Sequence, residues 1–333
     1  MWTLLQRISK NLILAIPAMM LLGLAYGLVA DARWLKSLII PFTFLMVYPM
    51  MVTLKIRQVF EGGDVKAQVA AQAINFLIIP FLTYGVGLLF FADQPYMALG
   101  LLLAGLVPTS GMTISWTGFA KGNVAAAVKM TVIGLTLGSL ATPLYVMGLM
   151  GATIDVNIGM VLSQILLIVF LPMFLGYVTQ QALVKRFGRE AFQKNIGPRF
   201  PALSTLGVLG IVFVALALKA HTLVGSPGLL LRILLPLALL YSVNYVLSTF
   251  VARALLPRGD AIAMVYGTVM RNLSIALAIA INAFGEKGSD AALVVALAYI
   301  IQVQSAAWYV KYTDRVFGAA PQKPAMATAA AKA

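Results

Sequence analysis

Ten long apolar segments follow one another along the 333-residue chain, and they constrain its fold more than any other feature. A helix that crosses the hydrocarbon layer of a membrane needs about 20 mainly apolar residues. Only 10% of the residues are charged, far below the share of about a quarter in water-soluble domains. The pattern predicts an all-α, polytopic membrane protein with ten transmembrane helices. The segments lie near residues 12–30, 35–54, 69–91, 96–119, 123–148, 157–180, 201–219, 228–252, 261–284 and 290–310.

The distribution of basic residues predicts how the chain is oriented. Lys and Arg gather in the loops that face the cytoplasm in membrane proteins. If the chain begins in the cytoplasm, 17 of its 24 Lys and Arg residues lie on the inner side, five on the outer side and two within spans. We therefore expect a multi-pass plasma-membrane protein with both termini in the cytoplasm. The formal net charge of +14 follows from this topology, so we expect a lipid bilayer and no nucleic acid as its surroundings.

Several kinds of chemistry are excluded by the residues that the chain lacks. It has no cysteine and a single histidine, His221, so we expect neither a disulfide nor a metal site, and no cofactor. The ten acidic residues all fall in loops, at the ends of spans or in the tail. We therefore expect no carboxylate within the membrane to carry a proton or sodium. The sequence shows no paired catalytic carboxylates, nucleophile elbow or phosphate-binding loop, so we expect no enzyme.

The longest polar interruption, residues 181–199, separates five spans from five. The second half then enters the membrane in the opposite sense, as in the inverted repeats of many secondary transporters. We expect one membrane unit over residues 1–316, with repeats at about 10–150 and 155–313. The Ala- and Pro-rich residues 317–333 are expected to form a disordered cytoplasmic tail.

Matching interruptions are predicted in spans four and nine, where a transporter of this type binds its solute. Pro108 and Gly111 interrupt the fourth span, and Gly267 interrupts the ninth. Pro removes a backbone donor and Gly loosens a helix, so backbone groups become free for a ligand. A simple proline kink with hydroxyls bonded to their own helix is the alternative. The candidate substrate-binding residues beside these breaks are Thr109, Ser110, Thr113, Arg271, Asn272 and Ser274.

Two cations fall within predicted spans, and each needs a partner because an isolated charge is costly in a membrane. Arg271 can bind an anionic solute through its guanidinium fork, neutralise the carbonyl groups of a half-helix end, or face a water-filled vestibule. Lys129 can extend to the cytoplasmic interface or act as a proton carrier that couples transport.

Four stretches resemble one known superfamily, the bile acid:sodium symporters, and within it the arsenite efflux permeases of the yeast and bacterial type. They are Tyr48–Met51, Pro108–Asn123, Ala141–Leu144 and the residues from Asn272 onward, of which Ala120-Lys121-Gly122-Asn123 is the most specific. The resemblance covers about residues 10–315. It implies a panel domain of helices 1, 2, 6 and 7, a core domain of helices 3–5 and 8–10, and broken helices 4 and 9 that cross. Movement of the core against the panel would give alternating access.

This chain also departs from the pattern of that superfamily. The arsenite permeases have a cysteine after the proline of span four and a glutamate in span nine, where this chain has Thr109 and Ser274. The sodium-coupled members hold sodium with a glutamate and a glutamine at the positions of Gly267 and Arg271, and with an asparagine at Ile114. The resemblance therefore implies arsenite efflux, whereas the residues favour an organic anion or oxyanion without sodium coupling. A non-transporting membrane sensor is the remaining alternative.

Overall fold

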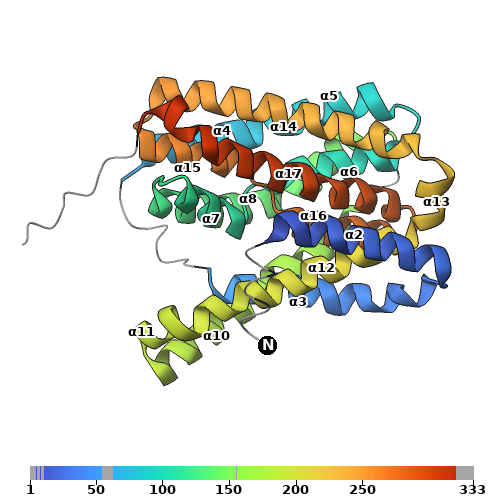
Figure 1. Ribbon diagram of the computed structural model, residues 1–333, viewed down its shortest axis with the longest axis horizontal. Coiled ribbons are helices and arrows are strands. Elements are labelled where there is room, and N and C mark those ends of the chain that lie inside the picture. Colours follow the sequence, from blue (N-terminus) through green and yellow to red (C-terminus); the bar gives the residue numbers. More distant parts are fainter. Residues whose placement is uncertain (1–4, 6–7, 9–10, 55–62, 155, 320–333) are drawn as a thin grey trace, which may run out of the picture.

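The computed structural model describes residues 5, 8, 11–54, 63–154 and 156–319, and within these residues every regular element is helical (Figure 1). The helices of the first half are α2 (Leu12–Val29), η1 (Arg33–Leu38), α3 (Ile39–Val52), α4 (Val65–Ala73), η3 (Ile74–Ile78), α5 (Ile79–Phe91), α6 (Pro95–Leu106), α7 (Gly111–Phe119) and α8 (Val124–Met150). Those of the second half are α9 (Ile158–Ile165), η4 (Leu166–Phe170), α10 (Leu171–Phe187), α11 (Arg189–Ala191), η5 (Phe192–Ile196), η6 (Gly197–Arg199), α12 (Phe200–Leu218), α13 (Ala220–Gly225), α14 (Gly228–Leu255), α15 (Arg258–Val269), α16 (Leu273–Phe284) and α17 (Gly288–Phe317).

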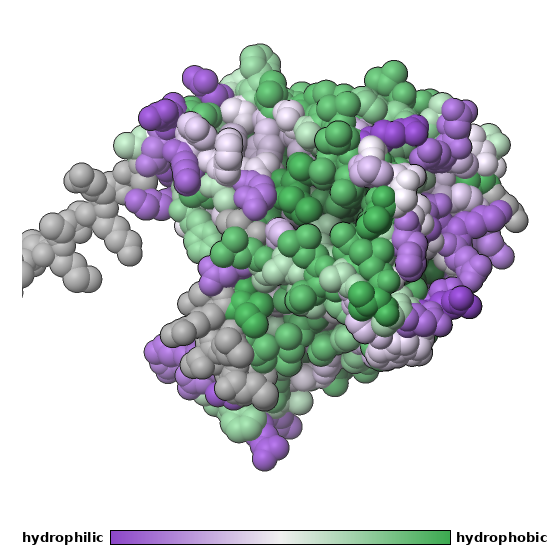
Figure 2. Space-filling view, turned by 45° about the vertical axis from the view of Figure 1, so that its right-hand side comes forward, coloured by the Kyte–Doolittle hydropathy of each residue, from purple (hydrophilic) through white to green (hydrophobic). Residues whose placement is uncertain are grey.

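Within the described residues, seven helices are long and apolar enough to cross a membrane. They are Arg33–Val52, Val65–Phe91, Val124–Met150, Ile158–Phe187, Arg189–Leu218, Gly228–Leu255 and Gly288–Phe317. Three shorter apolar helices, at Leu14–Val29, Pro95–Leu106 and Leu273–Phe284, coincide with predicted spans one, four and nine. Figure 2 shows a broad apolar band between hydrophilic ends, as expected of a protein whose middle faces lipid rather than water. The chain is a multi-pass membrane protein, and the full set of ten spans stays a prediction.

The helices lie roughly along one axis and form two groups (Figure 1). In the first group α12 packs against α2 and α3, and α10 packs against α3. In the second group α17 packs against α6 and α16, α5 packs against α6, and α14 packs against α15. We call these the first and the second group below.

Glycines let the helices of the first group approach closely. A Cβ atom at Gly23 would lie 2.4 Å from the carbonyl oxygen of Phe213, and one at Gly27 would lie 2.1 Å from that of Ala217. A Cβ at Gly207 would meet the backbone nitrogen of Met46 at 2.3 Å. Small residues thus set the spacing of α12 against α2 and α3, as is usual in helix packing within membranes.

The structure differs in detail from the predictions for two segments, the one between the two halves of the chain and the C-terminal tail. The polar interruption at residues 181–199 is helical except at Gly188, because α10 continues to Phe187 and short helical turns lead on to α12. The predicted tail begins one residue later than expected, since Phe317 closes α17. From residue 320 onward the tail lies outside the described residues.

Candidate functional site

Two interruptions of the helical backbone meet in the middle of the second group. The segment between α6 and α7 runs antiparallel to the segment between α15 and α16, with Pro108 paired to Arg271. The N–H of Thr109 donates to the carbonyl of Met270, and the N–H of Asn272 donates to the carbonyl of Val107, each at 2.8 Å. Each break therefore satisfies backbone groups that the other break has freed, which a membrane interior requires.

The half-helices that leave this crossing each begin with a side-chain cap. The Ser110 hydroxyl accepts from the N–H of Met112, and the Thr113 hydroxyl accepts from the N–H of Ser110, so these residues form a capping box. On the other side, the side-chain oxygen of Asn272 accepts from the N–H of Ile275. The amino ends of α7 and α16 thus start at the crossing, and each carries the partial positive charge of a helix amino terminus.

Gln302 of α17 holds the second break in place. Its side-chain oxygen accepts from the N–H of Arg271 at 2.8 Å, and its side-chain nitrogen donates to the carbonyl of Arg271 at 3.2 Å. The same oxygen accepts from the hydroxyl of Tyr241 at 2.8 Å. Both backbone groups of one residue are therefore bonded by one buried amide.

A cavity of about 350 Å³ lies between the two groups of helices, beside the crossing. It extends toward the end of the bundle where α3 ends and where α8 and α12 begin. None of the described residues that line it is charged, and hydroxyl, amide and apolar side chains make up the wall. The lining residues are Leu12, Met50, Thr53, Leu54, Ser110, Gly111, Met112, Ile114, Val124, Val128, Thr131, Leu135, Pro201, Ser204, Thr205, Val208, Asn272 and Ser274.

The structure brings some of the candidate substrate-binding residues to this cavity and places others elsewhere. Ser110, Asn272 and Ser274 line it, as does the helix-break residue Gly111. The remaining five candidates from these breaks do not line it: Thr109, Thr113, Arg271, Pro108 and Gly267.

Those remaining residues have structural contacts. Thr109 adopts a left-handed backbone (φ 65°), and its hydroxyl donates to the carbonyls of Pro108 and Thr131. Thr113 is fully buried within the capping box. Gly267 was expected at the break, but α15 continues to Val269 and the backbone leaves the helix only at Met270. Gly267 instead leaves room for a side chain of α8, since a Cβ there would lie 2.6 Å from the sulfur of Met130.

Arg271 points away from the large cavity. Its side chain is 3% exposed and lines a separate cavity of about 10 Å³, together with Ile79, Ala104, Gly105, Leu240, Tyr241 and Asn244. The reason is local geometry, because successive side chains of an extended segment point to opposite faces. Asn272 faces the large cavity, so Arg271 faces the other side.

The guanidinium of Arg271 lies near the carboxyl end of α6, where a cation is favoured by the helix dipole. Its two terminal nitrogens have no hydrogen-bond partner among the described residues. The nearby carbonyls of α15 are bonded to side-chain amides, since Asn75 donates to Gly267 and Asn244 donates to Thr268, each at 3.0 Å. Neither of these two asparagines was predicted from the sequence. Asn75 lies in η3, the π-helical turn between α4 and α5. Such turns are common at functional sites. No pattern in the sequence predicts this one.

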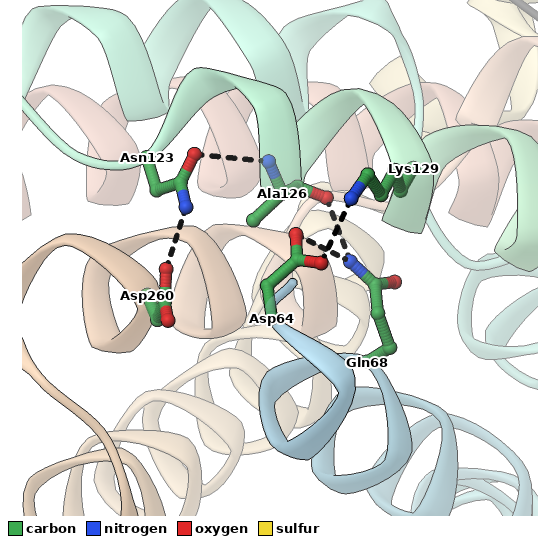
Figure 3. A network of polar contacts seen from close by, with 6 residues as sticks. All are labelled: Asp64, Gln68, Asn123, Ala126, Lys129 and Asp260. Atoms are coloured by element: carbon green, nitrogen blue, oxygen red, sulfur yellow. Dashed lines mark hydrogen bonds and ion pairs between the residues drawn. The ribbon is translucent and has the colours of Figure 1, made fainter. Parts of the chain in front are cut away.

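One acidic residue that was predicted to lie at the end of a span is buried in the structure. Asp64, the residue before α4, is paired with Lys129 at 3.0 Å, and their side chains are 5% and 6% exposed (Figure 3). Gln68 donates to the carbonyl of Ala126 and, at 3.4 Å, to the second oxygen of Asp64. The ammonium group of Lys129 is therefore buried inside the protein against a partner 65 positions earlier in the chain.

Beside this pair, the short loop before α8 is tied to α15 (Figure 3). The side-chain nitrogen of Asn123 donates to Asp260 at 2.7 Å, and its oxygen accepts from the N–H of Ala126. The N–H of Asn123 also donates to the carbonyl of Gly259. The Ala120–Asn123 motif thus joins the loop between α7 and α8 to the first turn of α15.

A helical membrane bundle with two interrupted helices that cross beside a cavity of hydroxyl, amide and apolar side chains is built as a transporter rather than as an enzyme. The comparison with known families agrees. The family model described as the sodium bile acid symporter family matches residues 40–226, which is more than half of the chain. The chain belongs to this family, whose members are membrane transporters.

Among similar proteins are two named "Arsenical-resistance protein Acr3". The one from Alkaliphilus metalliredigens is 25% identical over 92% of both chains. The one from Corynebacterium glutamicum is 21% identical over 74% of this chain and 70% of its own length. A Bacillus subtilis protein named "Uncharacterized sodium-dependent transporter YocS" is 28% identical over 74% of this chain and 75% of its own length.

Proposed function

We propose that this protein is a secondary transporter that moves a small solute by alternating access, with ten spans arranged as two inverted repeats. The seven long helices, α2 and the two interrupted pairs α6–α7 and α15–α16 supply the ten spans. The first group of helices corresponds to the panel and the second group to the core that moves against it. The cavity between the two groups is the solute site.

The position of two half-helix amino ends at the cavity carries the proposal about the solute. Ser110 and Asn272 cap α7 and α16 and also line the cavity, so the positive ends of both half-helices face the solute. Most of the remaining wall is apolar or carries hydroxyl groups such as those of Ser204 and Thr205. This combination suits a small organic anion, with its carboxylate or sulfonate near the crossing and its apolar body along the wall.

The test is a screen for ligand-induced thermal stabilisation of the purified protein, followed by counterflow uptake into liposomes. We expect short aliphatic carboxylates or sulfonates to raise the melting temperature of the wild type. Val208→Trp fills the cavity and should abolish the shift, whereas Leu231→Trp, on the exposed face of α14, should preserve it. Equal stabilisation of all three proteins would show that the anions do not bind in this cavity.

Arsenite is the second candidate, and the names of the two arsenical-resistance relatives favour it. The absence of cysteine counts against it, because arsenic(III) is thiophilic and the chain offers no thiolate. The neutral hydroxyl wall could still bind it by hydrogen bonds. Stabilisation by arsenite, with no effect of carboxylates and sulfonates, would favour this candidate over the organic anion.

We further propose that transport does not depend on sodium. The guanidinium of Arg271 is a permanent cation near the carboxyl end of α6, and it occupies the side of the crossing where a bound cation would be favoured. Uptake by the wild type should be unchanged when choline replaces sodium on both sides of the membrane. A several-fold loss of uptake on that replacement would contradict this assignment.

The buried pair of Lys129 and Asp64 is the proposed coupling site, with a proton as the coupling ion. Lys129 lies on α8 between the cavity residues Val128 and Thr131, so a change at the pair can reach the solute site. The charged group that approaches from α15 is Asp260, which binds Asn123. An imposed pH gradient should drive uptake by the wild type but not by Asp64→Asn/Lys129→Gln. Unchanged gradient-driven uptake in the double variant would exclude the pair.

A further inference from the structure

A second, separate cavity lies on the outer surface of the second group, between α14 and α17. It has a volume of about 620 Å³ and is lined by Tyr245, Val246, Thr249, Phe250, Arg253, Ala254 and Tyr309. α14 is one of the long apolar helices, and only 33% of its most apolar stretch is buried inside the protein. The groove therefore faces the membrane.

The groove has an apolar length and a cationic end. Val246 and Phe250 are 71% and 74% exposed, and Arg253 follows them on the same face of α14 at a spacing of seven residues from Val246. At a rise of about 1.5 Å per residue, this stripe is about 10 Å long. The rings of Tyr245 and Tyr309 are in contact at a tilt of 33°, with centroids 4.8 Å apart, and join α14 to α17 along it.

Arg253 lies in the last turn of α14, close to the predicted cytoplasmic surface of the membrane. It forms no ion pair with a carboxylate of the described residues, whereas Arg258, a few residues later, is paired with Asp314. A cation at this depth attracts the anionic lipids of the inner leaflet.

We propose that this groove is a binding site for one anionic phospholipid of the inner leaflet. An acyl chain lies along Val246 and Phe250, and the phosphate of the headgroup binds the guanidinium of Arg253. Guanidinium groups bind phosphate oxygens in a two-pronged manner, which favours Arg over Lys here. This site is independent of the solute cavity, since the two share no residue.

The experiment measures lipid retention by the purified full-length protein in native mass spectrometry. Phosphatidylglycerol and phosphatidylcholine with identical acyl chains are titrated separately. We expect the wild type to hold phosphatidylglycerol about five-fold more tightly, as one basic residue near a membrane surface provides. Arg253→Gln should lose this preference, and Arg253→Lys should keep part of it.

Two further variants complete the design. Arg232→Gln removes the exposed arginine at the other end of the same helix and should leave the preference unchanged. Val246→Trp fills the groove without removing charge and should weaken the binding of both lipids. The proposal would be overturned if the wild type bound the two lipids with equal affinity. It would also be overturned if Arg232→Gln lost the preference for phosphatidylglycerol as fully as Arg253→Gln. If the protein is a dimer and both lipids dissociate it equally, the groove is instead an interface between two copies of the protein.

Discussion

Gln302 shows at the scale of one residue how the interrupted backbone is stabilised. It binds the N–H and the carbonyl of Arg271 and the hydroxyl of Tyr241, and it is itself fully buried. Gln302→Leu keeps a similar volume but leaves these groups without partners. Each buried polar group without a partner lowers the free energy of unfolding by about 1–3 kcal/mol. We expect a melting temperature at least roughly 4 °C lower in detergent and a clear loss of transport.

The matched control for this variant is Ser305→Ala on the same helix. The Ser305 hydroxyl donates to the carbonyls of Ile301 and Gln302 within α17, so its removal should change the melting temperature little. Equal melting temperatures for Gln302→Leu and the wild type would show that the amide does not hold the break.

The buried ion pair of Asp64 and Lys129 should stabilise the protein only while both charges are present. Asp64→Asn removes the carboxylate that is paired with the buried ammonium group of Lys129, and breaking a buried ion pair costs about 3–5 kcal/mol. Asp64→Asn/Lys129→Gln removes both charges and should be more stable than the single variant. Chemical unfolding of the four proteins in the double-mutant cycle measures this coupling.

The exposed pair of Glu190 and Lys194 serves as the control for the buried one. Its side chains are 79% and 72% exposed, so Glu190→Gln should change stability by about 1 kcal/mol or less. If Asp64→Asn and Glu190→Gln lowered the free energy of unfolding by comparable amounts, burial would not determine the strength of the ion pair at Lys129.

At the scale of elements, the glycine face of α8 positions the first break. A Cβ at Gly138 would lie 2.5 Å from the ring of Pro108, and one at Gly134 would lie 2.7 Å from the hydroxyl of Thr109. Gly138→Ala should therefore displace the segment before α7, with a cost of about 1–3 kcal/mol, and lower the initial rate of uptake by about ten-fold. Gly148→Ala on the same helix meets nothing within 4 Å and should behave as the wild type. Equal uptake rates for the two variants would show that this packing is not needed for transport.

The elements themselves were largely predictable, and the site was predictable only in part. A membrane interior requires that backbone groups bond within helices, so long apolar runs indicate helices, and Pro108 marks an interruption. The direction of Arg271 was not predictable, because it depends on the extended backbone that pairs the two breaks. Asp64 resembled an ordinary loop residue, because its partner Lys129 is distant in sequence and the contact arises only when α4 packs beside α8.

At the scale of the whole molecule, two ion pairs join the two groups of helices at the end away from the solute cavity. Lys36 of η1 binds Glu286, which lies between α16 and α17, at 2.8 Å. Lys219, which follows α12, binds Asp290 in the first turn of α17 at 2.6 Å. The hydrogen bond from Lys36 and its charge lower the pKa of Glu286, so the first pair persists as pH falls until that lowered value is reached. By the predicted topology this end is the outer one, so we predict that the two pairs help to hold the carrier closed to the outside.

A covalent link across this outer end should therefore hold the carrier closed to the outside. The chain has no cysteine, so Lys36→Cys/Glu286→Cys provides the only two thiols for a cleavable bifunctional reagent. We expect uptake into liposomes to fall to background after cross-linking and to return after cleavage, because alternating access requires the two groups of helices to separate there. Solute-induced thermal stabilisation should persist, since the cavity extends from the crossing toward the other end of the bundle. Glu190→Cys/Lys194→Cys places the same link between the consecutive helical turns α11 and η5 and should leave uptake unchanged. Normal uptake by the protein linked across residues 36 and 286 would mean that solute passes without separation of the outer end, and alternating access between these two groups would have to be abandoned.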